Sequence, residues 1–93
     1  MVSTGNRRAP RLGPAINNLG ALYVRAGQLN DAIAALRYGI EVAPSDESFY
    51  LNLGSLYVSM DDRDAARQVI QRLLERKPAS PMGLQALREL DRR

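Results

Sequence analysis

The sequence predicts an all-α chain, an antiparallel helix-hairpin solenoid with five helices. Three observations support this class. One segment is written twice at an offset of 34 residues: residues 18–24 read NLGALYV and residues 52–58 read NLGSLYV. Apolar residues recur at helical spacing, and no stretch alternates apolar and polar residues long enough to argue for a strand. Every link between the helical segments is short, so neighbouring helices must form antiparallel hairpins, which stack into a continuous surface.

The first predicted hairpin occupies the N-terminal half of the chain. Its first helix is expected to begin at Pro14, because the missing N–H of proline is not needed in the first helical position. Gly27 ends this helix, since glycine adopts a left-handed conformation at little cost. A second helix is predicted over residues 29–42 and is closed by Pro44. The apolar residues of the two helices are Ile16, Leu19, Leu22, Tyr23 and Ala26, followed by Leu29, Ile33, Leu36 and Ile40.

The second predicted hairpin follows directly. Ser45 or Asp46 can cap a third helix that runs through about residue 60. Asp62 is expected to cap a fourth helix over about residues 63–77, with Asp64 near its positive end. The apolar residues of these helices are Phe49, Tyr50, Leu53, Leu56 and Tyr57, followed by Ala66, Val69, Ile70, Leu73 and Leu74.

A fifth helix closes the predicted fold. Ser80 and Pro81 form an N-cap and first-position pair that predicts its start. Leu84, Leu87 and Leu90 are expected on its packed side.

Composition excludes several kinds of chemistry. The 93 residues include neither cysteine nor histidine, which removes thiol nucleophiles, imidazole bases, disulfides and the usual zinc ligands. We therefore expect no enzyme activity, no cofactor and no metal. No apolar run approaches the roughly 20 residues of a membrane-spanning helix, and no signal peptide is encoded. A cytoplasmic location is expected, and the chain is compatible with a fragment of a longer protein.

Basic charge is concentrated near the N-terminus. The formal net charge is +3, and Arg7, Arg8 and Arg11 lie in the first twelve residues, which contain no acid. Without these three, the remaining basic and acidic residues are equal in number. Residues 1–12 lack apolar periodicity and are predicted to be a disordered basic tail. Nucleic-acid binding usually needs a concentrated basic face on the folded part, so a nucleic-acid partner is not expected.

The repeated residues resemble a known family, the tetratricopeptide repeat. In that family a Leu-Gly pair and a Tyr lie on the first helix, small residues on the second, and a Pro ends the repeat. The resemblance implies a domain over residues 13–93, with repeats at 13–46 and 47–80 and a capping helix at 81–92. The matching positions are Ile16, Leu19, Gly20, Tyr23, Gly27, Leu29, Ala32, Leu36, Gly39 and Pro44, then Tyr50, Leu53, Gly54, Tyr57, Asp61, Arg63, Ala66, Ile70, Leu73 and Pro78.

Small residues at the matching positions predict close helix packing. Gly20 and Ala32 are expected to let the helices of the first hairpin approach, and Gly39 to do so between the second and third helices. A glycine inside a helix costs about 1 kcal/mol relative to alanine. Gly20 and Gly54 therefore indicate a packing requirement.

Five residues depart from the family pattern. Asp61 replaces the turn glycine, and aspartate is among the few residues that tolerate a left-handed conformation. Arg63 stands at an apolar position, where its stem can still cover apolar surface. Leu73 replaces a small residue, so the fifth helix is expected to pack at a larger distance or altered angle. Arg88 and Asp91 replace a small residue and the tyrosine, so the array is expected to end there.

In this family the first helices of successive repeats line a concave groove that binds a peptide. Asn18 and Asn52 stand at equivalent positions, and their amides suit the backbone of an extended peptide, unless asparagine is simply common there. The family's clamp for a C-terminal carboxylate is matched only at Asn52 and lacks a cation. We therefore expect a protein or peptide ligand of low charge. The expected groove residues are Asn17, Asn18, Ala21, Arg25, Leu51, Asn52, Ser55, Ser59, Gln85 and Glu89. The other positions that match the family's groove are Pro14, Val24, Ser48, Val58, Met82, Ala86 and Arg92.

Two functions fit these observations. The first is a non-catalytic protein–protein interaction module that binds a peptide segment in the groove. The alternative is an assembly element that self-associates through its exposed terminal helices, forming a homo-oligomer. Two and a half repeats are fewer than the roughly three that such arrays need for stability, and Ala15, Leu22 and Ala26 are expected to expose apolar surface on the first helix. Asp61, Asp62 and Asp64 resemble the start of a calcium loop but fit a capped turn better.

Overall fold

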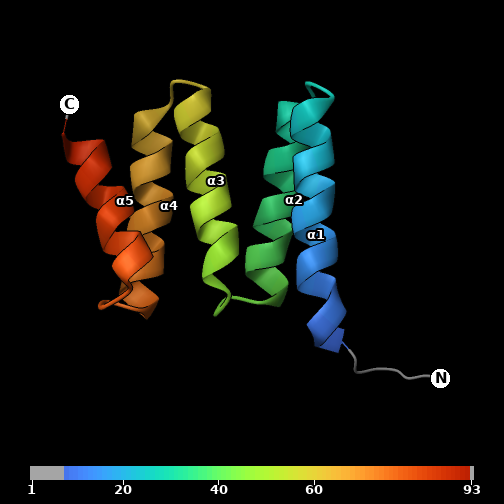
Figure 1. The fold of residues 1–93 in the computed structure, drawn as a ribbon, viewed down its shortest axis with the longest axis horizontal. Coiled ribbons are helices and arrows are strands. Elements are labelled where there is room, and N and C mark those ends of the chain that lie inside the picture. Colours follow the sequence, from blue (N-terminus) through green and yellow to red (C-terminus); the bar gives the residue numbers. More distant parts are fainter. Residues whose placement is uncertain (1–7, 93) are drawn as a thin grey trace. The chain divides into compact units, whose positions relative to one another are not determined.

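The computed structural model of the chain describes residues 8–92, which form five α-helices joined by short turns (Figure 1). No strand occurs within this range, so the predicted all-α class is confirmed. The first seven residues of the predicted tail, including Arg7, lie outside the described part. The helices are α1 (Arg8–Arg25), α2 (Leu29–Val42), α3 (Glu47–Ser59), α4 (Arg63–Arg76) and α5 (Pro81–Asp91).

The chain divides between Asp46 and Glu47 into two compact units. The first unit holds the hairpin of α1 and α2, and the second holds α3, α4 and α5. In each unit, consecutive helices pack side by side in antiparallel order (Figure 1). The helix-hairpin organisation predicted from the short links is therefore present in both units.

The start of α1 differs from the prediction. The helix begins at Arg8, so Pro14 lies inside it and the predicted start at Pro14 is wrong. Residues 8–12, which were assigned to a disordered tail, are helical. Proline is most favourable in the first turn of a helix, but its presence does not require the helix to begin there. Further inside a helix, proline removes one backbone hydrogen bond. The segment ahead of Pro14 contains good helix formers in Arg8, Ala9, Arg11 and Leu12 and poor ones in Pro10 and Gly13.

The helices of each hairpin approach at a glycine. A Cβ atom placed on Gly20 would lie 3.3 Å from Cδ2 of Leu36, and one on Gly54 would lie 3.0 Å from Cδ1 of Ile70. These two contacts are equivalent, because both residues of each pair are shifted by 34 positions. Ala32 and its equivalent Ala66 are both completely buried. The predicted role of Gly20 and Ala32 in close packing is thereby supported by the contacts within the first unit.

The first helix of each hairpin, α1 or α3, ends in the same kind of left-handed turn. Gly27 has a φ of 77° and Asp61 a φ of 63°, as the sequence predicts for these equivalent positions. The backbone N–H of Gln28 donates to the carbonyl of Tyr23 at 2.8 Å, and that of Asp62 donates to the carbonyl of Tyr57 at 2.9 Å. This bond, spanning six residues, closes the C-terminal turn and satisfies a carbonyl that the helix leaves unpaired.

The predicted caps of α4 and α5 are confirmed. Asp62 Oδ1 accepts a hydrogen bond from the backbone N–H of Ala65 at 3.1 Å. Ser80 Oγ accepts one from the backbone N–H of Gly83 at 3.0 Å. The Ser80 hydroxyl also donates to Oε1 of Glu47 at 2.6 Å, so this buried side chain joins the start of α5 to the start of α3.

The packed side of α5 is rotated from the predicted one. Leu90 is buried and Leu87 half-buried, but Leu84 is 42% exposed. Gly83 is buried instead, and a Cβ atom there would lie 3.1 Å from Leu73 and 3.0 Å from Leu74. Leu84 is equivalent to Ile16 and Tyr50, which are both buried. Within the described residues, no second helix follows α5 to cover Leu84.

Candidate functional site

A pocket of about 310 Å³ lies in the second unit, among α3, α4 and α5. Six of its nine lining residues are apolar or glycine, and the other three are polar or charged. The lining therefore offers both apolar and polar contacts to a ligand. The lining residues are Leu51, Gly54, Ser55, Val58, Arg63, Ile70, Ala86, Glu89 and Leu90.

Helical periodicity explains how α3 and α5 form the walls of the pocket. Leu51, Ser55 and Val58 are separated by four and three residues, which places them on one face of α3. Ala86, Glu89 and Leu90 have the same kind of spacing on α5. The pocket brings together five residues at predicted groove positions, namely Leu51, Ser55, Val58, Ala86 and Glu89.

The floor of the pocket comes from buried core residues. Ile70 of α4 and Leu90 of α5 belong to one hydrophobic cluster with Ala66. Gly54 is buried against Ile70, so no side chain of α3 fills this space. The small side chains of Ser55 and Ala86 leave the pocket open above this floor. The glycine that brings α3 and α4 together therefore also gives the pocket its depth.

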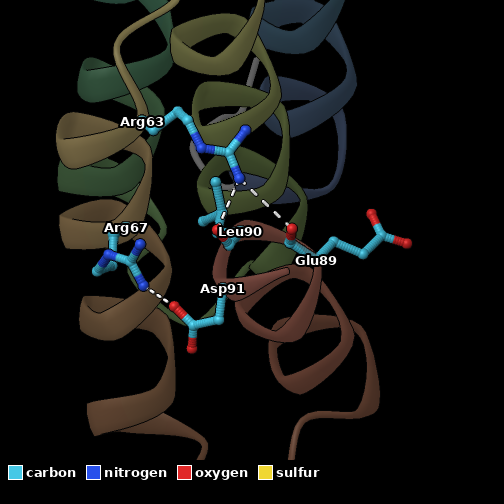
Figure 2. A network of polar contacts seen from close by, with 5 residues as sticks. All are labelled: Arg63, Arg67, Glu89, Leu90 and Asp91. Carbon is cyan, nitrogen blue, oxygen red and sulfur yellow. Dashed lines mark hydrogen bonds and ion pairs between the residues drawn. The ribbon is translucent and has the colours of Figure 1, made fainter. Parts of the chain in front are cut away.

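Arg63 lies at the edge of the pocket and links α4 to α5 (Figure 2). Its Nη2 atom donates to the backbone carbonyl of Leu90 at 2.6 Å and lies 3.5 Å from that of Glu89. Carbonyls in the last turn of a helix have no partner within the helix and carry partial negative charge, so a guanidinium stabilises them. From the sequence, only the stem of Arg63 is assigned a role, and no sequence signal predicts this contact of its guanidinium group.

A second contact between the same helices involves Arg67 and Asp91. The guanidinium of Arg67 donates to the carboxylate of Asp91, forming an ion pair at the surface (Figure 2). From the sequence, Asp91 is interpreted only as a departure from the family pattern that marks the end of the repeat array. Its partner lies 24 residues away, and helical spacing within α5 gives no signal for such a pair.

The remaining predicted groove residues of the second unit lie outside this pocket. Asn52, Ser59 and Gln85 are all exposed. The hydroxyl of Ser59 donates to the carbonyl of Leu56 at 2.7 Å, and the amide of Gln85 donates to Oε2 of Glu89 at 3.4 Å. The Gln85 contact holds the Glu89 carboxylate along its own helix, beside the pocket.

The predicted groove residues of the first unit share one side of α1. Asn18, Ala21 and Arg25 are exposed, and Asn17 is half-buried. Asn18 and Asn52, the repeated pair, are both exposed on their own helices. Their contact with a peptide stays a prediction.

The described residues give no sign of a metal centre or of a membrane-crossing helix. Within residues 8–92, no group of three or more acidic side chains is arranged to hold a metal ion. In the same range, every helix is too short or too polar to cross a bilayer. Asp61 lies in the left-handed turn and Asp62 caps α4, which is the capped turn preferred over a calcium loop in the sequence analysis.

Comparison with protein families agrees with the repeat found in the sequence and the hairpins found in the structure. A family model for the tetratricopeptide repeat matches residues 15–90. No curated protein matches the chain. Domains of this family generally mediate protein–protein interactions and are typically non-catalytic. Since the matched range takes in most of the chain, the chain belongs to the tetratricopeptide repeat family.

Proposed function

We propose that the chain is a non-catalytic interaction module that binds a peptide segment of low charge on the groove face of α3 and α5. The pocket of the second unit carries this proposal, because it gathers predicted groove residues from both helices around an apolar floor. Concave, mostly apolar pockets with a few polar groups are the usual sites of ligand binding. The protein partner is expected to place one or more side chains there.

The asparagines add a second element to this proposal. Asn52 is exposed on α3, next in sequence to the pocket residue Leu51. A side-chain amide both donates and accepts hydrogen bonds, so it can pair with the backbone of an extended peptide. We propose the same role for Asn18 in the first repeat, on the α1 face that also carries Asn17, Ala21 and Arg25.

Selection from a random-peptide phage library tests the proposal. The immobilised protein should enrich a family of peptides, whose affinities are then measured by calorimetry as free synthetic peptides. Ser55→Arg should weaken their binding by about tenfold or more, because the new side chain occupies the pocket entrance. Gln71→Arg is the matched control, since it adds the same charge at an exposed position of α4 outside the pocket. Equal weakening by both substitutions, or no enrichment at all, would contradict the proposal.

A second candidate function is self-association, and the exposed face of α1 favours it. Leu19 and Leu22 were placed on the apolar stripe of the first hairpin, yet they are 43% and 57% exposed. Together with Leu12, Ala15 and Ala26, all of them exposed, they repeat at alternating spacings of three and four residues. This spacing forms a continuous apolar seam along a helix, of the kind that packs against another helix.

The packing of α5 within the second unit supports this candidate function by analogy. Gly83, Leu87 and Leu90 of α5 are equivalent to Ala15, Leu19 and Leu22 of α1. In the second unit, Gly83 lies against Leu73 and Leu74, while Leu87 and Leu90 join the hydrophobic cluster of Ala66 and Ile70. We propose that in an assembly the seam of α1 is covered in the same way, by a second helix of another hairpin.

Light scattering over a range of protein concentrations tests the assembly proposal. Self-association should give a defined oligomer, and Leu22→Glu should return it to a monomer, because a buried carboxylate is strongly disfavoured. Tyr38→Glu is the control, since Tyr38 is 51% exposed on α2 and lies outside the seam. A strict monomer at every concentration would rule this candidate out.

A further inference from the structure

We infer that one face of α5 binds an acidic helix of another protein, which places an apolar side chain and two carboxylates against it. This open face of α5 consists of Pro81, Leu84, Arg88 and Arg92. The pocket residues Ala86 and Leu90 each lie two positions from Arg88, and therefore on nearly the opposite side of the helix. Arg92 also matches a groove position of the family and lies where the two sides meet. The open face is thus a second surface, independent of the proposed peptide groove.

An apolar side chain is exposed on the open face. Leu84 is 42% exposed, although the equivalent residues Ile16 and Tyr50 are buried. In the second unit α5 packs on α4, and no further helix of this unit covers its other side (Figure 1). Arg88 stands where the equivalent residue Gly54 lets α4 approach α3. A closely packed apolar helix therefore does not fit the open face, whereas a partner that pairs with a guanidinium does.

The arginines of the open face carry positive charge that α5 does not compensate. Arg88 and Arg92 are exposed, and among the described residues neither guanidinium has a hydrogen bond or ion pair. The acidic side chains of α5 are both engaged, since Asp91 pairs with α4 and Glu89 is contacted by Gln85 at 3.4 Å. Like charges one turn apart on a helix are destabilising. Carboxylates from a partner would relieve this repulsion and form charge-assisted hydrogen bonds.

The spacing of the open face indicates the shape of the partner. Leu84, Arg88 and Arg92 follow one another at intervals of four residues, so successive residues are about 6 Å apart along the helix. A partner helix with one apolar and two acidic residues at the same interval can meet all three. The α1 helix of a second copy does not supply these groups, because α1 contains no acidic residue.

Another pair of arginines in the second unit shows what the open face adds. Arg72 and Arg76 are also four residues apart, and both are exposed on α4. No large apolar residue is exposed on α4, so this pair offers charge without an apolar contact. Arg72 and Arg76 therefore provide a matched control for the charge of the open face.

Titration with synthetic helical peptides tests the inference. The peptides are alanine-rich and carry one leucine and two glutamates at intervals of four residues, in either order along the chain. At millimolar concentration and low ionic strength, they should shift the methyl resonances of Leu84, while those of the buried Leu36 in the first unit serve as the internal control. Glutamine in place of both glutamates should weaken binding about tenfold, as expected for two exposed ion pairs. Equal binding of the glutamine peptides, or no shift of Leu84 with either glutamate peptide, would overturn the inference.

Variants of the protein locate the binding surface. Arg88→Gln combined with Arg92→Gln should weaken binding of the glutamate peptide about tenfold. Arg72→Gln combined with Arg76→Gln removes the same charge from α4 and should leave the affinity unchanged. Methyl resonances of the buried Ile70 report whether each double variant keeps its fold. Equal weakening by the two double variants would show a response to overall charge and would overturn the inference.

The protein without peptide tests whether a second copy occupies the open face. The Leu84 methyl resonances should not depend on protein concentration. A concentration-dependent shift of these resonances that disappears when Arg88 and Arg92 are replaced by glutamine would identify a second copy as the occupant, and the inference of an acidic partner protein would be overturned.

Discussion

At the scale of single residues, glycine determines how closely the helices of each hairpin approach. Gly20 faces Leu36 and Gly54 faces Ile70, at distances that leave little room for a Cβ atom. A glycine within a helix is unfavourable by about 1 kcal/mol relative to alanine, so close packing must compensate for it. The conformational entropy that each glycine loses on folding is therefore offset by the contacts between the two helices.

Replacement of Gly20 by leucine is expected to separate the first hairpin. The larger side chain would enter the space occupied by Leu36, and overpacking of this kind lowers the free energy of unfolding by about 1–3 kcal/mol. Ala21→Leu adds the same side chain at the exposed neighbouring position and should change the stability little. Thermal denaturation of the two variants provides the measurement. Similar melting temperatures would show that Gly20 has no packing role.

The residues at the left-handed turns also affect the stability of the fold individually. Gly27 and Asp61 stand at equivalent positions and both have positive φ. For residues other than glycine, asparagine and aspartate, this conformation costs about 1–2 kcal/mol. Asp61→Val should therefore destabilise the second unit by about that amount, whereas Asp61→Gly should retain its stability or raise it. Urea denaturation followed by circular dichroism measures both variants, and equal stability of the two would contradict the assignment of strain to this position.

One residue relation was not predictable from the family pattern. Because Leu73 replaces a small residue, the sequence predicts that it holds α5 at a larger distance. In the structure Gly83 lies opposite Leu73 and makes room for its side chain. At the positions 34 residues earlier, Gly39 and Phe49, the small and large residues are exchanged. The predicted packing of Gly39 against the third helix stays a prediction.

At the scale of helices, α5 is held to α4 by arginine contacts as well as by its apolar side. Arg63 binds backbone carbonyls in the last turn of α5, and Arg67 pairs with Asp91 (Figure 2). Hydrogen bonds from charged donors contribute about 1.5–3 kcal/mol, while exposed ion pairs contribute about 0.2–1 kcal/mol. Arg63 is therefore expected to matter more than Arg67, whose partner is 54% exposed.

Removal of the Arg63 side chain should loosen the end of α5. In Arg63→Ala the carbonyls of Leu90 and Glu89 lose this donor, so the last turn of α5 opens more often. Hydrogen exchange of the α5 amides should become faster by about tenfold or more, which corresponds to the contribution of a charged hydrogen bond. Arg72→Ala, at an exposed position of α4, is the matched control. Unchanged α5 exchange in Arg63→Ala would contradict this role.

The other end of α5 is fixed by a different polar contact. Ser80 caps α5 and donates to Glu47, whose carboxylate also lies 3.4 Å from Nζ of Lys77. The sequence predicts the cap, because serine before proline is a common helix start. It does not predict the contact with Glu47, which lies 33 residues earlier and depends on how α3, α4 and α5 pack.

At the scale of the whole molecule, the excess charge is a local feature. The formal net charge of +3 equals the contribution of Arg7, Arg8 and Arg11. Such a short basic segment gives weak, salt-dependent binding to polyanions without sequence preference. The positive net charge therefore comes from the N-terminal residues and is no evidence for a nucleic-acid-binding fold.

Substitution of all three arginines by glutamine tests this conclusion. The wild type is expected to bind a fluorescent oligonucleotide weakly at low ionic strength, and this binding should disappear by about 0.15 M salt, where charges are screened beyond about 8 Å. The triple variant should show no binding at either salt concentration. Anisotropy provides the measurement, and salt-resistant binding by the triple variant would reveal a nucleic-acid surface on the folded part.

The sequence by itself determined the repeat, the order and bounds of most helices, and the left-handed turns at Gly27 and Asp61. These features depend on local chemistry and on the 34-residue period, both of which can be read along the chain. Five of the pocket residues were also named in advance, because the family resemblance implies a groove along the first helices of the repeats.

Only the tertiary structure decided the relations between distant residues. Arg63 with Leu90, Arg67 with Asp91 and Leu73 with Gly83 are each brought together by the packing of α5 on α4. In that packing Gly83 is buried against Leu73 and Leu74, whereas Leu84 remains 42% exposed. The physical reason is that a helix can present several faces with similar apolar content, and the neighbouring helix selects the face whose shape it fits.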